Sequence, residues 1–183
     1  MATRCERREV FTVHVNSQNV ASPQNAGNFT VYIDIPLRNV VKAELIMASL
    51  SPDANTSAVV HVYIPELISK FNQRAGVSTA ISVSNTYTVI GSSTGSQSNV
   101  GLINNSFATL PFDSASYLNG SVGRLIYNKN SNFPTDTEYI EPIRQLKQLS
   151  VQLYNPSGVP TAVNGTSYFT FRFECAKDNV CIY

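Results

Sequence analysis

The sequence predicts an all-β protein, a sandwich or a barrel, on three observations. Apolar residues recur at every second position in one segment after another, which is the period of a strand with one buried face. Clusters of Gly, Pro, Asn and Ser separate these segments at short intervals. No segment has the pattern of a long amphipathic helix, so about nine short strands account for the chain.

These alternating segments define the predicted strands. They are residues 9–15, 28–35, 40–50, 58–64, 81–90, 106–112, 122–127, 149–154 and 167–174. Pro36 is expected to end the second strand, because proline cannot donate to a ladder. Residues 40–50 also contain good helix formers, but their alternation and their strand neighbours favour a strand. Pro65 is expected to begin one or two helical turns over residues 65–74, since its missing N–H costs least there.

The last predicted hairpin has the clearest pattern. A short turn beginning at Tyr139 leads into the strand at 149–154, where Tyr154 is expected on the polar face. Residues 155–158 read Asn-Pro-Ser-Gly, which is strong turn chemistry because Pro presets φ and Gly accepts φ > 0. Ile35 is expected on the same face as Phe29. The residues expected to face the core are Phe29, Val31, Ile33, Leu45, Val151, Leu153, Phe169, Phe171 and Phe173.

The composition fits one domain with a substantial core. The chain has 183 residues, of which 43% are hydrophobic. We expect a single domain over residues 1–183, with residues 1–8 and 176–183 as terminal extensions. Charged residues make up only 14%, against roughly 25% in ordinary domains. A neutral polar surface is cheaper to desolvate than a charged one, which suits a protein packed among neighbours and equally a loop-rich β-protein.

Charge and hydropathy exclude several partners. The net charge of +1 argues against a dedicated nucleic-acid binder. Arg4, Arg7 and Arg8 cluster near the start, but Glu6 and Glu9 interleave with them, so a solvated terminus is favoured over a genome-binding arm. No apolar run approaches the roughly 18 residues of a membrane span, so no membrane insertion is expected. No basic-then-apolar leader precedes the first strand, so no cleaved signal peptide is expected.

Cysteines and histidines give no recognisable site. Cys5, Cys175 and Cys181 form no CxxC and leave an odd one, which favours reduced thiols in a cytoplasmic assembly over a secreted disulfide framework. His14 and His61 lie within strand patterns, and their order among the cysteines has no metal-ligand spacing. We therefore expect no disulfide, no metal site and no cofactor.

Two candidate catalytic motifs are not supported by the residues around them. Residues 91–95 match G-x-S-x-G around Ser93, but that motif needs a helix after the turn and a histidine downstream, and both histidines precede it. Asp136, Glu138 and Glu141 could supply the paired carboxylates of a glycosidase, although a loop cluster before Pro142 is the commoner explanation. No P-loop or dinucleotide fingerprint occurs, so no enzyme and no catalytic residue are predicted. Five N-x-[ST] sequons, which a chain rich in Asn, Ser and Thr generates by chance, begin at Asn28, Asn55, Asn104, Asn119 and Asn164.

Several short sequence motifs of the chain, called phrases below, occur in the same order in one known family. A hydrophobic strand spans residues 41–50, and Tyr63-Ile-Pro-Glu-Leu67 ends the next strand. Ser106-Phe-Ala-Thr-Leu-Pro-Phe112 follows, then the E-P-I-x-x-L-x-x-L strand at 141–149 and the aromatic final strand. This ordered set, which covers roughly residues 40–175, resembles the single jelly-roll penton and minor capsid proteins of large icosahedral double-stranded DNA viruses. The long stretch at 69–105 departs from the family and is expected to be a local insertion with its own contact.

The resemblance implies a single eight-stranded jelly-roll β-sandwich that builds shells and carries no cofactor or catalytic residue. It implies a vertex penton subunit that forms a homopentamer, or alternatively a non-vertex minor capsid protein that cements or underlies the major capsomers. The implied partners are further copies and neighbouring capsid proteins, and the implied location is the virion capsid, assembled in the host cytoplasm. First and last strands are neighbours in the family, so Cys5 and Cys175 are the pair of thiols that would come closest.

A jelly-roll carbohydrate-binding module is a more remote alternative. Such modules use exposed aromatic side chains, often Trp, and this chain has none. Four tyrosines expected on polar faces could substitute, namely Tyr32, Tyr63, Tyr87 and Tyr154. The sequence names no residue of a subunit interface.

Overall fold

The computed structural model describes residues 7–19, 26–51, 59–69, 79–81, 87–89, 105–111, 125–130, 135–155, 158–161, 163 and 165–177. Their strands are β1 (Arg7–Asn16), β2 (Asn28–Leu50), β3 (Val59–Tyr63), β4 (Thr79–Ile81), β5 (Tyr87–Val89), β6 (Ala108–Pro111), β7 (Leu125–Asn128), β8 (Thr135–Tyr154) and β9 (Tyr168–Lys177). Two 3-10 turns, η1 (Ser17–Asn19) and η2 (Pro65–Leu67), are the only helical elements among these residues. The fold is all-β, as the alternation predicts. Within the described ranges, no helix is long and apolar enough to span a bilayer.

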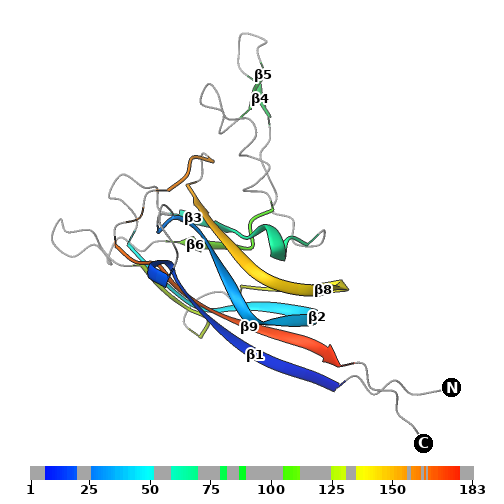
Figure 1. The fold of residues 1–183 in the computed structure, drawn as a ribbon. Helices are drawn as coiled ribbons and strands as arrows, with labels where there is room; N and C mark the ends of the chain where they lie inside the picture. Colours follow the sequence, from blue (N-terminus) through cyan, green and yellow to red (C-terminus); the bar gives the residue numbers. More distant parts are fainter. Residues whose placement is uncertain are drawn as a thin grey trace, which may run out of the picture.

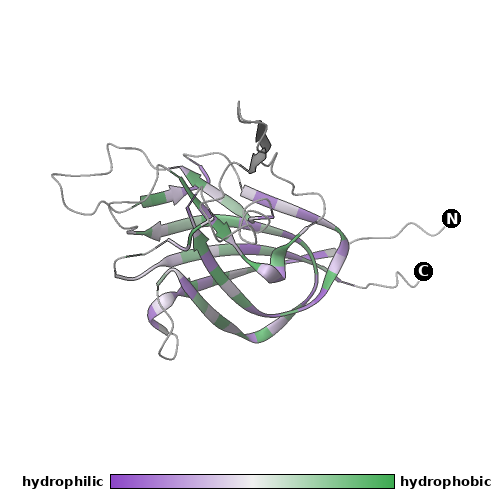
Figure 2. Ribbon diagram, turned by 90° about the horizontal axis from the view of Figure 1, so that it is seen from above, coloured by the Kyte–Doolittle hydropathy of each residue, from purple (hydrophilic) through white to green (hydrophobic). Residues whose placement is uncertain are grey.

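Seven strands form one antiparallel sheet, in which six follow the order β1-β9-β2-β8-β3-β6 (Figure 1). The seventh, β7, pairs with the end of β2. The two longest strands, β2 and β8, bend, and the sheet curls over on itself (Figure 2). Arm A of the sheet contains β1, β9, β7 and residues 40–50 and 135–143. Arm B contains residues 28–32 and 146–154 with β3 and β6.

Aromatic rings join the two arms. Phe29 in arm B lies 6.3 Å from Phe169 in arm A, measured between ring centroids. Phe107, immediately before β6, lies 6.0 Å from Phe171. The predicted core is confirmed, because all of its residues are buried except two, which are partly buried and pack against the others. Those two are Val31 and Ile33.

The prediction that Pro36 ends a strand is wrong, because β2 continues through it to Leu50. The ladder between β2 and β8 is interrupted between Tyr32 and Leu37, so Pro36 lies where no partner strand needs its missing N–H. Asn39 then adopts a φ of 51°, a left-handed conformation that asparagine tolerates better than most residues. The two strands predicted in this region are therefore the two halves of one bent strand.

The turn predicted from Tyr139 is also wrong, because β8 already begins at Thr135 and runs to Tyr154. A second register shift, opposite residues 40–42 of β2, leaves Pro142 without a ladder partner in that strand. The turn after β8 is confirmed. The N–H of Gly158 donates to the carbonyl oxygen of Asn155 at 3.0 Å, and Gly158 has the positive φ of 77° that glycine accepts without strain.

Other boundaries differ from the expectation. The helical turn after Pro65 spans only Pro65–Leu67, and residues 70–74 lie outside the described part of the chain. The range 81–90, predicted as one strand, contains β5 and the end of β4, which pair antiparallel as a separate two-stranded sheet. These two strands lie apart from the main sheet (Figure 1).

The predicted terminal extensions are too long at both ends. Arg7 and Arg8 belong to β1, where they pair with Lys177 and Ala176 of β9. The pairing of β1 with β9 extends the ladder to these residues. The sequence does not indicate this, because they do not alternate between apolar and polar side chains. The ends of β1 and β9 therefore lie side by side at one end of arm A (Figure 1).

Candidate functional site

The residues considered for catalysis do not converge among the described residues. Ser93 lies outside them. Nδ1 of His14 lies 3.1 Å from Oγ1 of Thr170, its cross-strand partner in β9. His61 repeats this arrangement with Thr109, at 3.0 Å. Both imidazoles are thus held by threonine hydroxyls on neighbouring strands, and no group of three His, Cys, Asp or Glu residues in the described ranges could hold a metal ion.

The acidic cluster predicted in a loop lies instead on β8, so that prediction is wrong. Asp136 and Glu138 are two positions apart and therefore share a face. Their carboxylates lie 2.6 Å and 3.7 Å from Nζ of Lys42 on β2. The hydrogen bond to Asp136 raises the pKa of Lys42, against partial burial, which lowers it. Glu141 is exposed further along the strand, so the cluster binds a lysine rather than forming a pair of catalytic acids.

Lys42 belongs to a row of ion pairs on the outer face of arm A. Arg8 of β1 lies 2.9 Å from Glu174 of β9, and Lys129 lies 3.0 Å from Glu44 of β2. These pairs lie at the surface and are partly exposed, and surface pairs contribute little to stability, about 0–1 kcal/mol each. Their consequence is a face on which most of the charges are paired, although Arg172 on the same face forms no ion pair with a described residue.

The tyrosines do not form an exposed aromatic platform among the described residues. Tyr63 and Tyr154 are buried against each other, with ring centroids 6.4 Å apart in an edge-to-face arrangement. Tyr154 shares the face of Gln152, as expected, because its hydroxyl donates to Oε1 of Gln152 at 2.7 Å. This face is covered at that point, since residue 154 pairs with Pro160 and its ring packs against Tyr63. Tyr32 is 77% exposed, and the side chain of Tyr87 lies outside the described set.

The Ile-Pro-Glu-Leu phrase closes one edge of β8. The ladder between β3 and β8 ends at the pair Tyr63 and Gln152, which leaves the next N–H groups of β8 without a strand partner on that side. The carboxylate of Glu66 accepts hydrogen bonds from the backbone N–H of Ser150 at 2.9 Å and from its hydroxyl at 2.7 Å. The hydroxyl of Tyr139 donates to the carbonyl oxygen of Leu67 at 3.0 Å. The phrase therefore has a structural role.

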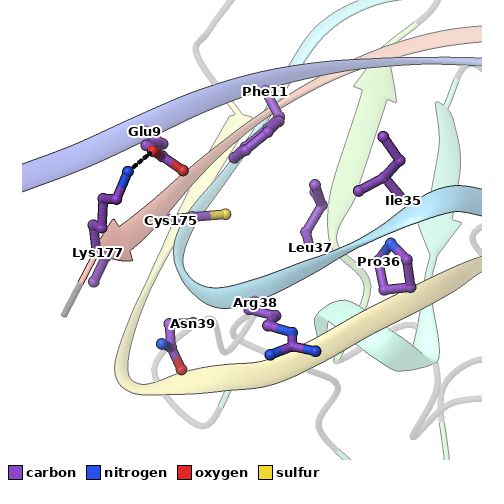
Figure 3. A pocket seen from close by; sticks show the side chains of 10 residues that line it. Glu9, Phe11, Ile35, Pro36, Leu37, Arg38, Asn39, Cys175 and Lys177 are labelled. Atoms are coloured by element: carbon purple, nitrogen blue, oxygen red, sulfur yellow. Dashed lines mark hydrogen bonds and ion pairs between the residues drawn. The ribbon is translucent and has the colours of Figure 1, made fainter.

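A pocket of about 300 Å³ lies where β2 turns away from β9, at the end of arm A that carries the chain ends. Its walls come from three strands, and Figure 3 shows Phe11, Leu37 and Cys175 directed into the space between them. The residues that line it include Glu9, Phe11, Ile35, Pro36, Leu37, Arg38, Cys175 and Lys177. The pocket thus combines an apolar interior with charged groups at its margin.

Charges at the pocket margin are unequally matched. Nζ of Lys177 lies 2.7 Å from the carboxylate of Glu9. Arg38 is exposed, and its guanidinium forms no ion pair with any described residue. Burial, and to a lesser degree the charge of Glu9, raises the pKa of the Cys175 thiol. The margin therefore carries an excess of positive charge, beside a thiol that is buried and free.

The sequence reasoning missed this pocket because it placed Ile35 on the core face. Ile35 is 78% exposed, since the ladder to β8 breaks after Tyr32 and the alternation no longer follows the sheet. The available signal was the Ile-Pro pair in the middle of an alternating run, because proline marks an interrupted ladder. Cys5 and Cys181 lie outside the described residues, so the expected absence of a disulfide remains a prediction.

Comparisons with known proteins add no assignment. No family model matches the chain, and no curated protein matches it. The strand order and the surfaces described above are therefore the basis of the functional argument.

Proposed function

We propose that the chain is a structural subunit of a virus shell that folds as a single eight-stranded jelly roll and forms the pentameric penton at an icosahedral vertex. The observation that carries the proposal is the order of the strand segments in the two arms. Arm A contains β1, β9, the second half of β2, β7 and the first half of β8. Arm B contains the first half of β2, the second half of β8, β3 and β6.

The chain passes between the arms in a symmetric order. β7 and the first half of β8 lie end to end along the same edge of β2, opposite the edge that β9 occupies, and count as one strand position. The eight positions then lie, from first to last, in arms A, B, A, B, B, A, B and A. This order supports a jelly roll, in which two interlocked Greek keys make two facing sheets of four strands. The jelly roll is a common fold of viral capsid and lectin domains. The family resemblance of the phrases at 41–50, 63–67, 106–112 and 141–149 favours the capsid role.

The surface of arm A suits a subunit that is packed among neighbours. Its outer face carries matched ion pairs such as Lys42 with Asp136, and the whole chain has only 14% charged residues. Covering unpaired ions would be costly, whereas matched or neutral groups are cheaper to cover. Head-to-tail contacts between identical wedges close into a ring when the rotation allows it, and a fivefold vertex is such a ring.

The purified full-length chain tests the ring directly. Native mass spectrometry should find a species of about 100 kDa, which is five times the chain mass of 20.0 kDa. A chain that stays monomeric at tens of micromolar would remove the self-assembling penton and leave the non-vertex minor capsid role, in which the partners are other capsid proteins.

The carbohydrate-binding alternative receives less support from the structure. Tyr63 and Tyr154 are buried against each other, so they cannot stack on a sugar. A glycan array probed with the full-length chain should give no saccharide signal. Reproducible binding to one class of glycan would favour the lectin role over the shell role.

A further inference from the structure

We propose that the pocket between β1, β9 and the bend of β2 receives residues 178–183 of a second copy of the chain, so that each subunit of the ring holds the next. The inference rests on the proposed ring-forming role, and it names the contact that joins the subunits. The pocket suits an apolar segment that also carries a negative charge. Phe11, Ile35 and Leu37 give it an apolar lining, while Arg38 stands at its margin without an ion-pair partner among the described residues.

An unpaired strand edge borders this pocket. β9 pairs with β2 only from Val40 onward, so the preceding half of β2 has β8 on one side and no described strand on the other. Along this half, Tyr32 and Ile35 are 77% and 78% exposed. An extended segment can add to such an edge through backbone hydrogen bonds while its alternate side chains enter a neighbouring pocket. The edge and the pocket together therefore fit an extended peptide rather than a small molecule.

Residues 178–183 have the matching sequence. They read Asp-Asn-Val-Cys-Ile-Tyr, that is, one acidic residue and one asparagine followed by three apolar residues and a tyrosine. Val180 and Ile182 are two positions apart, so they share a face of an extended segment. Asp178 supplies the negative charge that Arg38 lacks. The acidic residue would lie at the margin of the pocket beside Arg38, and the aliphatic residues that follow it would lie in the apolar interior.

The segment begins beside the pocket of its own chain, but the charge match between Asp178 and Arg38 favours the pocket of a neighbour. Lys177 lines the pocket, so docking within one chain requires a reversal immediately after it. A two-residue reversal would use residues 178–179, Asp-Asn, which tolerate the positive φ it needs, but it would place Asp178 in the turn rather than in the segment that enters the pocket. A wider turn would use Val180 itself. An extended segment of six residues instead reaches about 20 Å, enough to cross to an adjacent subunit.

Disulfide trapping between two differently tagged full-length chains tests the contact. The pocket partner carries a size tag and the changes Cys5→Ser, Cys181→Ser and Ile35→Cys; the segment partner carries only Cys5→Ser and keeps Cys181. After mixing and mild oxidation, we expect a tagged–untagged dimer in which mass spectrometry finds residue 35 of the pocket partner linked to residue 181 of the other. Adding Ile182→Asp to the segment partner should lower the yield at least about tenfold, because it places a charge in an apolar site.

Ile126→Asp is the matched control. Ile126 is also an exposed isoleucine on a strand, at 67%, but it pairs with Ser49 at the far end of β2 and does not line the pocket. Its replacement in the pocket partner should leave the yield within about twofold, well short of the tenfold that corresponds to 1.4 kcal/mol.

The outcomes separate this inference from the proposed function. A pentamer that yields no link to residue 181 overturns the docking contact and leaves the penton standing. A link found only inside one chain, in a variant that holds both Ile35→Cys and Cys181, also overturns it, because the segment then covers its own pocket. The absence of any pentamer by native mass spectrometry counts against the proposed function itself.

Discussion

Replacing Phe171 tests the packing of the two arms. Its side chain is fully buried. Its ring centroid lies 6.1 Å from those of Phe169 and Phe173 on the same strand, and 6.0 Å from that of Phe107. Because Phe107 belongs to the opposite arm, Phe171→Ala removes a contact between the arms as well as two along β9.

The expected loss follows from these contacts. Replacing a buried phenylalanine by alanine costs about 3–5 kcal/mol of unfolding free energy, the sum of a transfer term and a cavity term. Aromatic pairs contribute about 0.5–1.5 kcal/mol each beyond the area they bury, and Phe171→Ala removes all three. We therefore expect a loss in the upper part of the range, about 4–5 kcal/mol.

Urea unfolding at one fixed protein concentration measures this loss. With a slope of about 2 kcal/mol/M, the midpoint should fall by roughly 2 M. Tyr32→Ala is the matched control, because its ring is 77% exposed and its removal should change stability by no more than about 0.5 kcal/mol. A loss below about 1 kcal/mol for Phe171→Ala would mean that this ring does not lie between the arms.

Three further predictions concern single features. Glu66→Ala should cost about 1–3 kcal/mol, because it leaves the backbone N–H of Ser150 without its acceptor; an equal loss for the exposed Glu141→Ala would refute this reason. Gly158→Ala should cost about 1 kcal/mol or more, since alanine resists the positive φ of 77°, and an unchanged urea midpoint would contradict that. Alkylation of the unfolded, non-reduced chain should modify all three cysteines by intact mass, whereas native alkylation should spare Cys175, which is buried; a single modified thiol after unfolding would reveal a disulfide.

The sequence predicts the core well where the ladder is regular. In β9, Phe169, Phe171 and Phe173 are all buried, because every β9 residue from 168 to 175 has a partner on both sides, which preserves the period of two; the register shifts of the ladder to β2 fall within β2. The same rule fails at Ile35 and Pro36. A sequence displays the missing N–H of a proline, but it does not display a register shift that removes the need for that N–H.

The surfaces are harder to predict, because they depend on partners distant in sequence. The pocket joins Phe11 of β1, Leu37 of β2 and Cys175 of β9, and only the sheet order brings these together. Glu66 gains its role because β3 ends at Tyr63 and leaves an edge of β8 open. Local patterns carry no signal of where a neighbouring strand stops.

A cryo-EM reconstruction of the native particle tests the penton assignment most directly. We expect five copies of this chain around each fivefold axis, with the curled sheet of each copy recognisable by its bent β2 and β8. Density for the chain at any other position in the shell would contradict the penton assignment and leave a minor capsid role. Particles that lack the chain altogether would contradict the structural role itself.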